Sequence, residues 1–247
     1  MNENFTKFTA LVRYSIRRIL LSKKIVFLLV GLGFTVAVMG YASTQDVEKL
    51  WVGAGLMSGL IISFMVPITT MIYGSTIIQD DIEDRSITQI ISSPIDRVLS
   101  YLGYYLAIVI CLSAMLMAIT TAGFISFFGP LGIDSASLSI YIDITALVFI
   151  GTLVYSSLFM LVSLMTSKAV YFGLFYAFIW EGFVGSLPGN IQKVAISHYI
   201  KSISSSWIEY ISLDNASGLM LSFYILFALI VSLISFGCLL FRTKEFP

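Results

Sequence analysis

The sequence is poor in charge, because only 11% of its 247 residues are Asp, Glu, Lys or Arg, whereas soluble domains carry about 25%. Hydrophobic residues make up 58% of the chain, and its mean hydropathy is +0.95. A chain with so few charges cannot cover a water-soluble core with a polar surface. The composition therefore excludes an ordinary soluble domain and predicts an all-α integral membrane protein.

The residues that carry most site chemistry are also scarce. There are two cysteines, both inside apolar runs, and one histidine, His198, so neither a disulfide framework nor a metal cluster is expected. The sequence has no G-x-x-x-x-G-K-[ST] phosphate loop, and no G-x-S-x-G or H-E-x-x-H motif. Its basic residues are not interleaved with aromatics as in nucleic-acid-binding proteins. We therefore expect no catalytic residue, cofactor or metal in this chain, and no nucleic-acid partner.

Long apolar runs are what the sequence has instead. Six of them approach or exceed the roughly 20 residues that a spanning helix needs. They cover residues 25–43, 50–78, 102–128, 141–166, 169–187 and 218–241. Residues 1–24 precede them with an amphipathic, basic pattern typical of a helix in the lipid headgroup plane, the alternative being a cytosolic extension of the first span. We expect residues 1–247 to form one transmembrane domain.

The distribution of basic residues predicts the orientation. With a cytoplasmic N-terminus, eleven Lys and Arg residues lie inside and three lie outside, the latter being Lys49, Lys193 and Lys201. Both termini are then cytoplasmic. The segment 188–217 lies outside, and its many large apolar residues predict two short amphipathic pieces resting on or dipping into the outer leaflet. An ordinary extracellular loop is the alternative.

The polar segment between the second and third runs has the pattern of a short capped helix. Ser86 and Gln89 have the spacing of a capping box, and Pro94 ends the short helix that they would begin. Ile87, Ile90 and Ile91 would then share one face of that helix. An apolar helix face on the cytoplasmic side favours docking in the groove of a soluble partner. The alternative is a solvated loop with a single helical turn.

Glu181 is the exceptional acid within the apolar runs, and it follows Trp180 in the fifth. A charge inside a bilayer is costly, so such a residue suggests a polar cavity, a partner or protonation. We predict that Trp180 and Glu181 contribute to a pathway or outer gate, with a main-chain amide as a suitable partner for the carboxylate. A glutamate at the level of the outer headgroups is the alternative.

With its surroundings, the polar segment resembles the permease subunits of ABC-2 type transporters, the membrane domains of ATP-binding cassette exporters. The resemblance rests on an acid-rich end of the second span, a short helix, a proline and a basic residue before the third span, and it extends over the six-span layout. It implies docking residues Asp81, Glu83, Asp84, Ser86, Ile87, Gln89, Ile90, Ile91, Pro94 and Arg97. The sequence departs from the family pattern at Arg85-Ser86, where a Gly-Thr pair is common, and at Tyr104, where a lysine is common.

The resemblance also implies a function. The segment 86–92 would be the coupling helix of a permease that works as a dimer, most simply a homodimer, in the plasma membrane. Two copies of a separate ATP-binding cassette ATPase would bind ATP and Mg²⁺ and drive alternating access, so this chain would not be an enzyme. The alternative is a secondary carrier or ion pathway that uses Glu181, although the runs contain few other ionisable residues.

Overall fold

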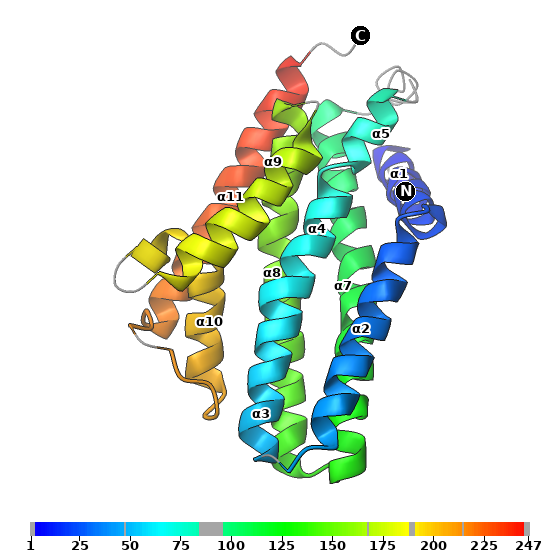
Figure 1. Cartoon of the computed structure of the whole chain (residues 1–247). Helices are drawn as coiled ribbons and strands as arrows, with labels where there is room; N and C mark the ends of the chain where they lie inside the picture. Colours follow the sequence, from blue (N-terminus) through cyan, green and yellow to red (C-terminus); the bar gives the residue numbers. More distant parts are fainter. Residues whose placement is uncertain are drawn as a thin grey trace.

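The computed structural model describes residues 3–46, 48–83, 96–166, 168–187, 191–213 and 215–244, and every regular element within these ranges is helical (Figure 1). In chain order the α-helices and turns of other pitch are α1 (Glu3–Leu21), α2 (Ile25–Ser43), α3 (Lys49–Leu56), η1 (Met57–Met65), α4 (Val66–Gly74), α5 (Ile77–Glu83), α7 (Arg97–Leu131), α8 (Ser135–Met165), α9 (Ala169–Phe175), η2 (Tyr176–Phe183), η3 (Val184–Ser186), η4 (Ile191–Val194), α10 (Ile196–Trp207) and α11 (Leu219–Thr243).

Within the described ranges, five helical stretches are long and apolar enough to cross a membrane. They are Ile25–Ser43, Lys49–Ile82, Arg97–Leu131, Ser135–Met165 and Leu219–Thr243. The run 169–187, predicted as a further span, forms only the shorter apolar helix Ala169–Phe183. At 1.5 Å per residue this helix is about 22 Å long, whereas the hydrocarbon core is about 30 Å thick. The described part of the chain is therefore that of a helical membrane protein, with five helices of spanning length.

Capping residues extend two helices beyond the apolar runs that predicted them. Asp96 accepts a hydrogen bond from the Val98 amide at the start of α7 (3.2 Å), five residues before the predicted start of the third run. Asp134 and Ser137 form a reciprocal capping box at the start of α8. Hydropathy marks only the apolar part of a helix, whereas polar caps fix where the helix begins.

The stretch Lys49–Ile82 changes pitch in its middle. Residues Met57–Met65 form a π-helical segment directly before Pro67, which lies in the first turn of α4. Proline lacks an N–H donor and its ring crowds the carbonyl one turn earlier, so a wider turn accommodates it. Eight of the nine residues of α4 are buried, which places this helix at the centre of the bundle.

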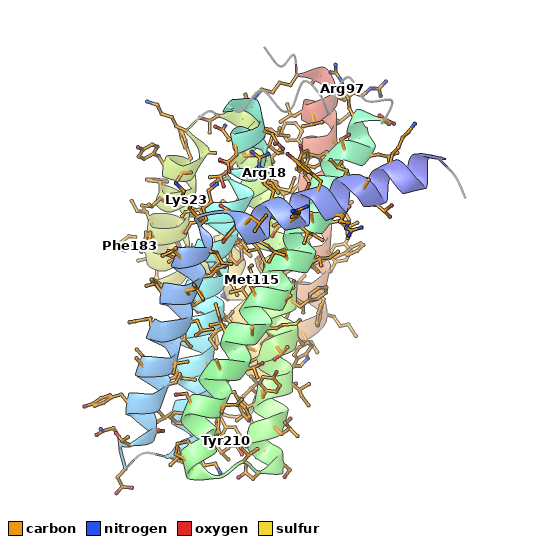
Figure 2. The ribbon with its side chains drawn as sticks, turned by 90° about the vertical axis from the view of Figure 1, so that its right-hand side faces the viewer. Arg18, Lys23, Arg97, Met115, Phe183 and Tyr210 are labelled. Atoms are coloured by element: carbon orange, nitrogen blue, oxygen red, sulfur yellow. The ribbon has the colours of Figure 1, made fainter. Side chains whose placement is uncertain are left out.

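The helices form an elongated bundle with both termini at the same end (Figure 1). At that end α1 lies across the bundle, nearly perpendicular to α2 and packed on α7 (Figure 2). Away from it, α10 packs against α8 and α11 through the buried Ile196, Ile200 and Ile203. The segment predicted to rest on the outer leaflet therefore packs in part within the protein, and it contributes one amphipathic helix and the short turn η4.

Candidate functional site

Two clusters of polar contacts join segments that are far apart in the sequence. The first, called here the α1 junction, comprises Arg18 and Lys24 from α1 and its link to α2, Asp80 and Asp81 from α5, and Tyr104 from α7. The second, called here the glutamate turn, comprises Tyr176 and Glu181 from η2 and the main chain of Ile196 and Ser197 from α10.

Asp81 is the buried centre of the α1 junction. Its side chain is 0% exposed, and its carboxylate forms an ion pair with the Arg18 guanidinium. The Tyr104 hydroxyl donates a hydrogen bond to the same carboxylate. A buried carboxylate needs such partners, because desolvation would otherwise cost several kcal/mol. Asp81 thus holds α1, α5 and α7 together.

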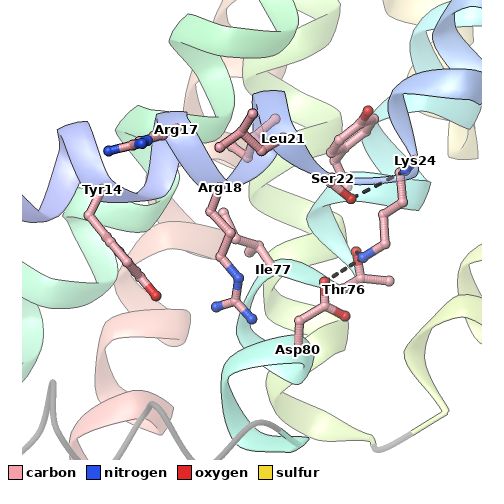
Figure 3. Close-up of a pocket in the computed structure, with 11 residues that line it drawn as sticks. Tyr14, Arg17, Arg18, Leu21, Ser22, Lys24, Thr76, Ile77 and Asp80 are labelled. Atoms are coloured by element: carbon pink, nitrogen blue, oxygen red, sulfur yellow. Dashed lines mark hydrogen bonds and ion pairs between the residues drawn. The ribbon is translucent and has the colours of Figure 1, made fainter.

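Asp80 forms the outer half of the junction. The Lys24 ammonium donates to Asp80 Oδ2 (2.5 Å) and to Thr76 Oγ1 (2.6 Å), as the dashed lines in Figure 3 show for this region. Both charged side chains are partly exposed, at 27% for Lys24 and 39% for Asp80. Because water screens such a pair, we expect it to contribute much less to stability than the Arg18–Asp81 pair.

A glycine allows α1 to lie close to α7. A Cβ atom added at Gly103 would be 3.0 Å from Leu11 Cδ2 and 3.5 Å from Phe8 Cε2. Leu11 is 7% exposed, so the apolar face of α1 is buried here against protein. The α1 junction therefore combines apolar packing of α1 against α7 with ion pairs to α5.

Side-chain donors also connect the helix ends near the junction. Gln79 of α5 donates to the carbonyl oxygens of Ser163 (3.1 Å) and Thr166 (2.6 Å) at the end of α8. Arg97 donates to the carbonyl of Arg242 at 3.0 Å, and the Lys244 ammonium donates to the carbonyl of Leu164 at 2.6 Å. Terminal carbonyls of a helix lack intrahelical partners, and cations near them are favourable. Movement of α5 is thereby linked to α8 as well as to α1.

Glu181 is the centre of the glutamate turn. It is 5% exposed, and its two oxygens accept hydrogen bonds from the amides of Ile196 (3.0 Å) and Ser197 (2.9 Å). The Tyr176 hydroxyl donates to Oε1 at 2.7 Å. The two amides are the first of α10, so the carboxylate occupies the positive end of that helix. The main-chain partner predicted for Glu181 is present, and the side chain is buried within the protein.

The pitch of η2 brings Tyr176 and Glu181 together. The stretch Tyr176–Phe183 is π-helical, and residues five apart lie one above the other when each turn is that wide. Close packing also limits the space beside the turn, because a Cβ at Gly185 would lie 2.9 Å from Ser197 Oγ. Trp180, which was predicted to share the role of Glu181, is 36% exposed.

His198 adds a titratable group to α10. Its Nε2 is 3.0 Å from Ser217 Oγ, and its Nδ1 has no hydrogen-bond partner among the described residues. Burial lowers the pKa of His198, and the nearby Lys193 and Lys201 lower it further. The imidazole is thus disposed to remain neutral. Within the part of the chain that the structure describes, no group of three or more His, Cys, Asp or Glu residues could hold a metal ion.

The predicted docking residues are only partly within the described ranges. Asp81 is paired inside the protein, Arg97 contacts the end of α11, and Glu83 lies at the end of α5. Asp84, Ser86, Ile87, Gln89, Ile90, Ile91 and Pro94 lie outside the described residues. For Asp81 the geometry indicates a positioning role within the chain instead of a surface for a partner.

Sequence reasoning missed most of the partners in these clusters. In the sequence, Arg18 and Lys24 stand out only as two of the basic residues that predict the cytoplasmic side, and Tyr104 only as a departure from a family pattern. The acids at the end of the second run and the cations at the end of α1 are both expected on the cytoplasmic side. Their opposite charges were therefore a signal that could have predicted ion pairs between them. Tyr176 gave no such signal, because its position beside Glu181 depends on a π-helical turn.

Comparisons with known proteins add no relative. No protein-family model matches the chain, and a search of the curated proteins found no match either.

Proposed function

We propose that this chain is the membrane-spanning permease subunit of an ATP-binding cassette transporter of the ABC-2 type, and that it works in export. On this proposal two copies form the pathway in the plasma membrane, with cytoplasmic termini, and two copies of a separate ATPase subunit bind ATP and Mg²⁺. The chain itself carries out no bond chemistry, and converts motion of the ATPases into alternating access.

The α1 junction is the observation that carries the proposal. It ties α5 to α1 and α7 immediately before the segment 86–92, which the sequence predicts to dock on the ATPase. A displacement of that segment would therefore pull on α5. Since α5 is bonded to α1, α7 and the end of α8, the pull would move these helices as a unit.

On this proposal the α1 junction acts at the cytoplasmic side of the pathway, and the glutamate turn acts at its outer side. It fixes the start of α10 to the end of η2, and α10 packs on α8 and α11. Movement of α8 relative to η2 would consequently change the position of α10. We propose that this coupling opens and closes the outer gate, with Glu181 as a positioning residue.

Helices with little internal burial support a second membrane subunit. Only 22% of the residues in the apolar stretch of α2, and 11% of those in the apolar stretch of α11, are buried inside the protein. On the proposal, lipid covers part of these apolar surfaces and a second copy of the chain covers the rest.

The geometry gives less support to a carrier that uses Glu181. Both carboxylate oxygens accept hydrogen bonds from main-chain amides, whose positions are fixed by the helix that they begin. A transported cation would have to replace these donors. We therefore retain the ABC permease as the proposal.

Affinity purification of the tagged chain from its native membranes tests the proposal. We expect an ATPase subunit to co-purify, identified by mass spectrometry and by ATP hydrolysis. Ile90→Asp is expected to abolish co-purification, because it would place a charge on the predicted apolar face. Ser92→Asp, on the opposite face by helical spacing, is the matched control. Recovery of equal ATPase with both variants, or of none with the parent, would contradict the proposal.

A further inference from the structure

A cavity lies beside α1 that neither the predicted docking segment nor the glutamate turn uses. Its volume is about 640 Å³, and it is bounded by α1, the α1–α2 link, α4 and α5. That volume is within the range of about 300–1,000 Å³ of small-molecule sites. Its chemically distinctive residues are Tyr14, Arg17, Arg18, Lys24, Tyr73 and Asp80.

The charge and polarity of this lining favour an anion. Arg17, Arg18 and Lys24 contribute three cations to the wall, whereas Asp80 contributes one carboxylate. Figure 3 shows Tyr14 and Arg18 projecting from α1 in the same direction, toward the side of Asp80 and Thr76. Guanidinium groups and phenolic hydroxyls are strong donors to phosphate oxygens.

Tyr73 also lines the cavity, but its hydroxyl oxygen is itself buried and does not face the open space. The groups that can donate to a bound anion are therefore the three cations and Tyr14.

The position of the cavity indicates where the anion comes from. It lies beneath a helix that crosses the end of the bundle at the level where the spans begin (Figure 2). On the same helix, Leu20 is 45% exposed and Leu21 is 74% exposed, as expected for side chains that contact acyl chains. A free phosphate would use the cations but would leave these leucines without apolar contacts.

We infer that this cavity binds the phosphate of an anionic phospholipid from the leaflet in which α1 lies. Arg17 supplies charge in excess of the two ion pairs of the α1 junction. A bound lipid would contact α1, α4 and α5 together, and would stabilise the α1 junction from its exposed side.

Thermal unfolding of the purified, delipidated chain in neutral detergent tests this site. We expect added phosphatidylglycerol to raise the unfolding temperature more than phosphatidylcholine with the same acyl chains, because lipid bound only to the folded state stabilises it. Arg17→Gln is expected to raise the half-saturating phosphatidylglycerol concentration roughly fivefold, in line with the loss of one cation at a membrane surface.

Arg13→Gln is the matched control, because Arg13 lies on the same helix and is exposed but does not line the cavity. Equal weakening by Arg13→Gln and Arg17→Gln would overturn the site in favour of general attraction to the surface. Equal stabilisation by the two lipids would overturn it too. If inorganic phosphate alone reproduced the full stabilisation, the assignment to a lipid would be wrong.

Discussion

Asp81 and Glu181 are both buried carboxylates, but the protein provides them with different kinds of hydrogen-bond and ion-pair partners. Asp81 is paired with the side chains of Arg18 and Tyr104, from two other helices. Glu181 accepts hydrogen bonds from two main-chain amides at the start of α10 and from the nearby Tyr176. The α1 junction is therefore a joint between side chains, whereas the glutamate turn is built into the backbone.

This difference has a consequence for how each cluster can change. A side-chain ion pair can be broken, exchanged or strengthened by a neighbouring charge, so the α1 junction is suited to transmit or regulate movement. The amides of Ile196 and Ser197 belong to the main chain of α10, so they cannot move as separate side chains can. The glutamate turn is suited to keep η2 and α10 in a fixed relation.

The largest effect is expected from Asp81→Ala in the α1 junction. The substitution would remove the carboxylate that pairs with the partly buried Arg18 and accepts from the buried Tyr104, and breaking a buried pair costs about 3–5 kcal/mol. Because Arg18 is 24% exposed, we expect the lower end of that range, measured as loss of unfolding free energy in detergent. Asp80→Ala is the control, with an expected loss of about 0.2–1 kcal/mol. Equal losses would contradict the distinction between the buried and the exposed pair.

A somewhat smaller effect is expected from Glu181→Leu in the glutamate turn. It would leave two amides and the Tyr176 hydroxyl without an acceptor, at a cost of about 1–3 kcal/mol for an unsatisfied buried group. Glu181→Gln would keep one carbonyl acceptor but direct an NH₂ group at an amide donor, so its loss should be intermediate. Hydrogen exchange at the start of α10 would measure both. Unchanged protection in Glu181→Leu would show that the carboxylate does not hold α10.

The close packing of the glutamate turn can be probed with two glycines. Gly185→Ala would place a Cβ 2.9 Å from Ser197 Oγ and 3.4 Å from Ala195 Cβ, and we expect a loss of about 1 kcal/mol. The Cβ added by Gly182→Ala would lie 3.7 Å from its nearest neighbour, the carbonyl oxygen of Ala177, so that variant should be neutral or slightly stabilising. Thermal unfolding of the pair measures the difference. A loss in Gly182→Ala equal to that in Gly185→Ala would contradict the assignment of the loss to the contact with Ser197 and Ala195.

The smallest effect is expected from pH, and it should come from His198, which follows the glutamate turn on α10. The pKa of His198 is lowered in the folded protein, so the folded state binds fewer protons than the unfolded state. Stability is then fully present above the unfolded value of about 6.5 and falls as the pH drops through and below it. Unfolding temperatures between pH 8 and pH 5 would show this slope. His198→Asn should remove it, whereas Asp81→Ala should keep it, because the α1 junction contains no histidine.

The sequence predicted the class of fold and most of the spans. The run 25–43 coincides with α2, and the runs 50–78 and 102–128 each lie within a helical stretch of spanning length. The runs 141–166 and 218–241 each extend one residue beyond such a stretch. Hydropathy succeeds here because insertion into lipid depends on a sum over consecutive residues. The amphipathic pattern of residues 1–24 likewise predicted α1, because its period is set by local helix geometry.

Only the tertiary structure decided the partners within the two clusters and the course of the chain around Glu181. Arg18 and Asp81 are 63 positions apart, and their pairing depends on the angle at which α1 crosses α5 and α7. The short helix Ala169–Phe183, its π-helical second half and the return through α10 depend on packing against α4, α8 and α11. Apolar length and periodicity are properties of a single segment, but the position of a buried carboxylate relative to its donors is set by the contact of several segments at once.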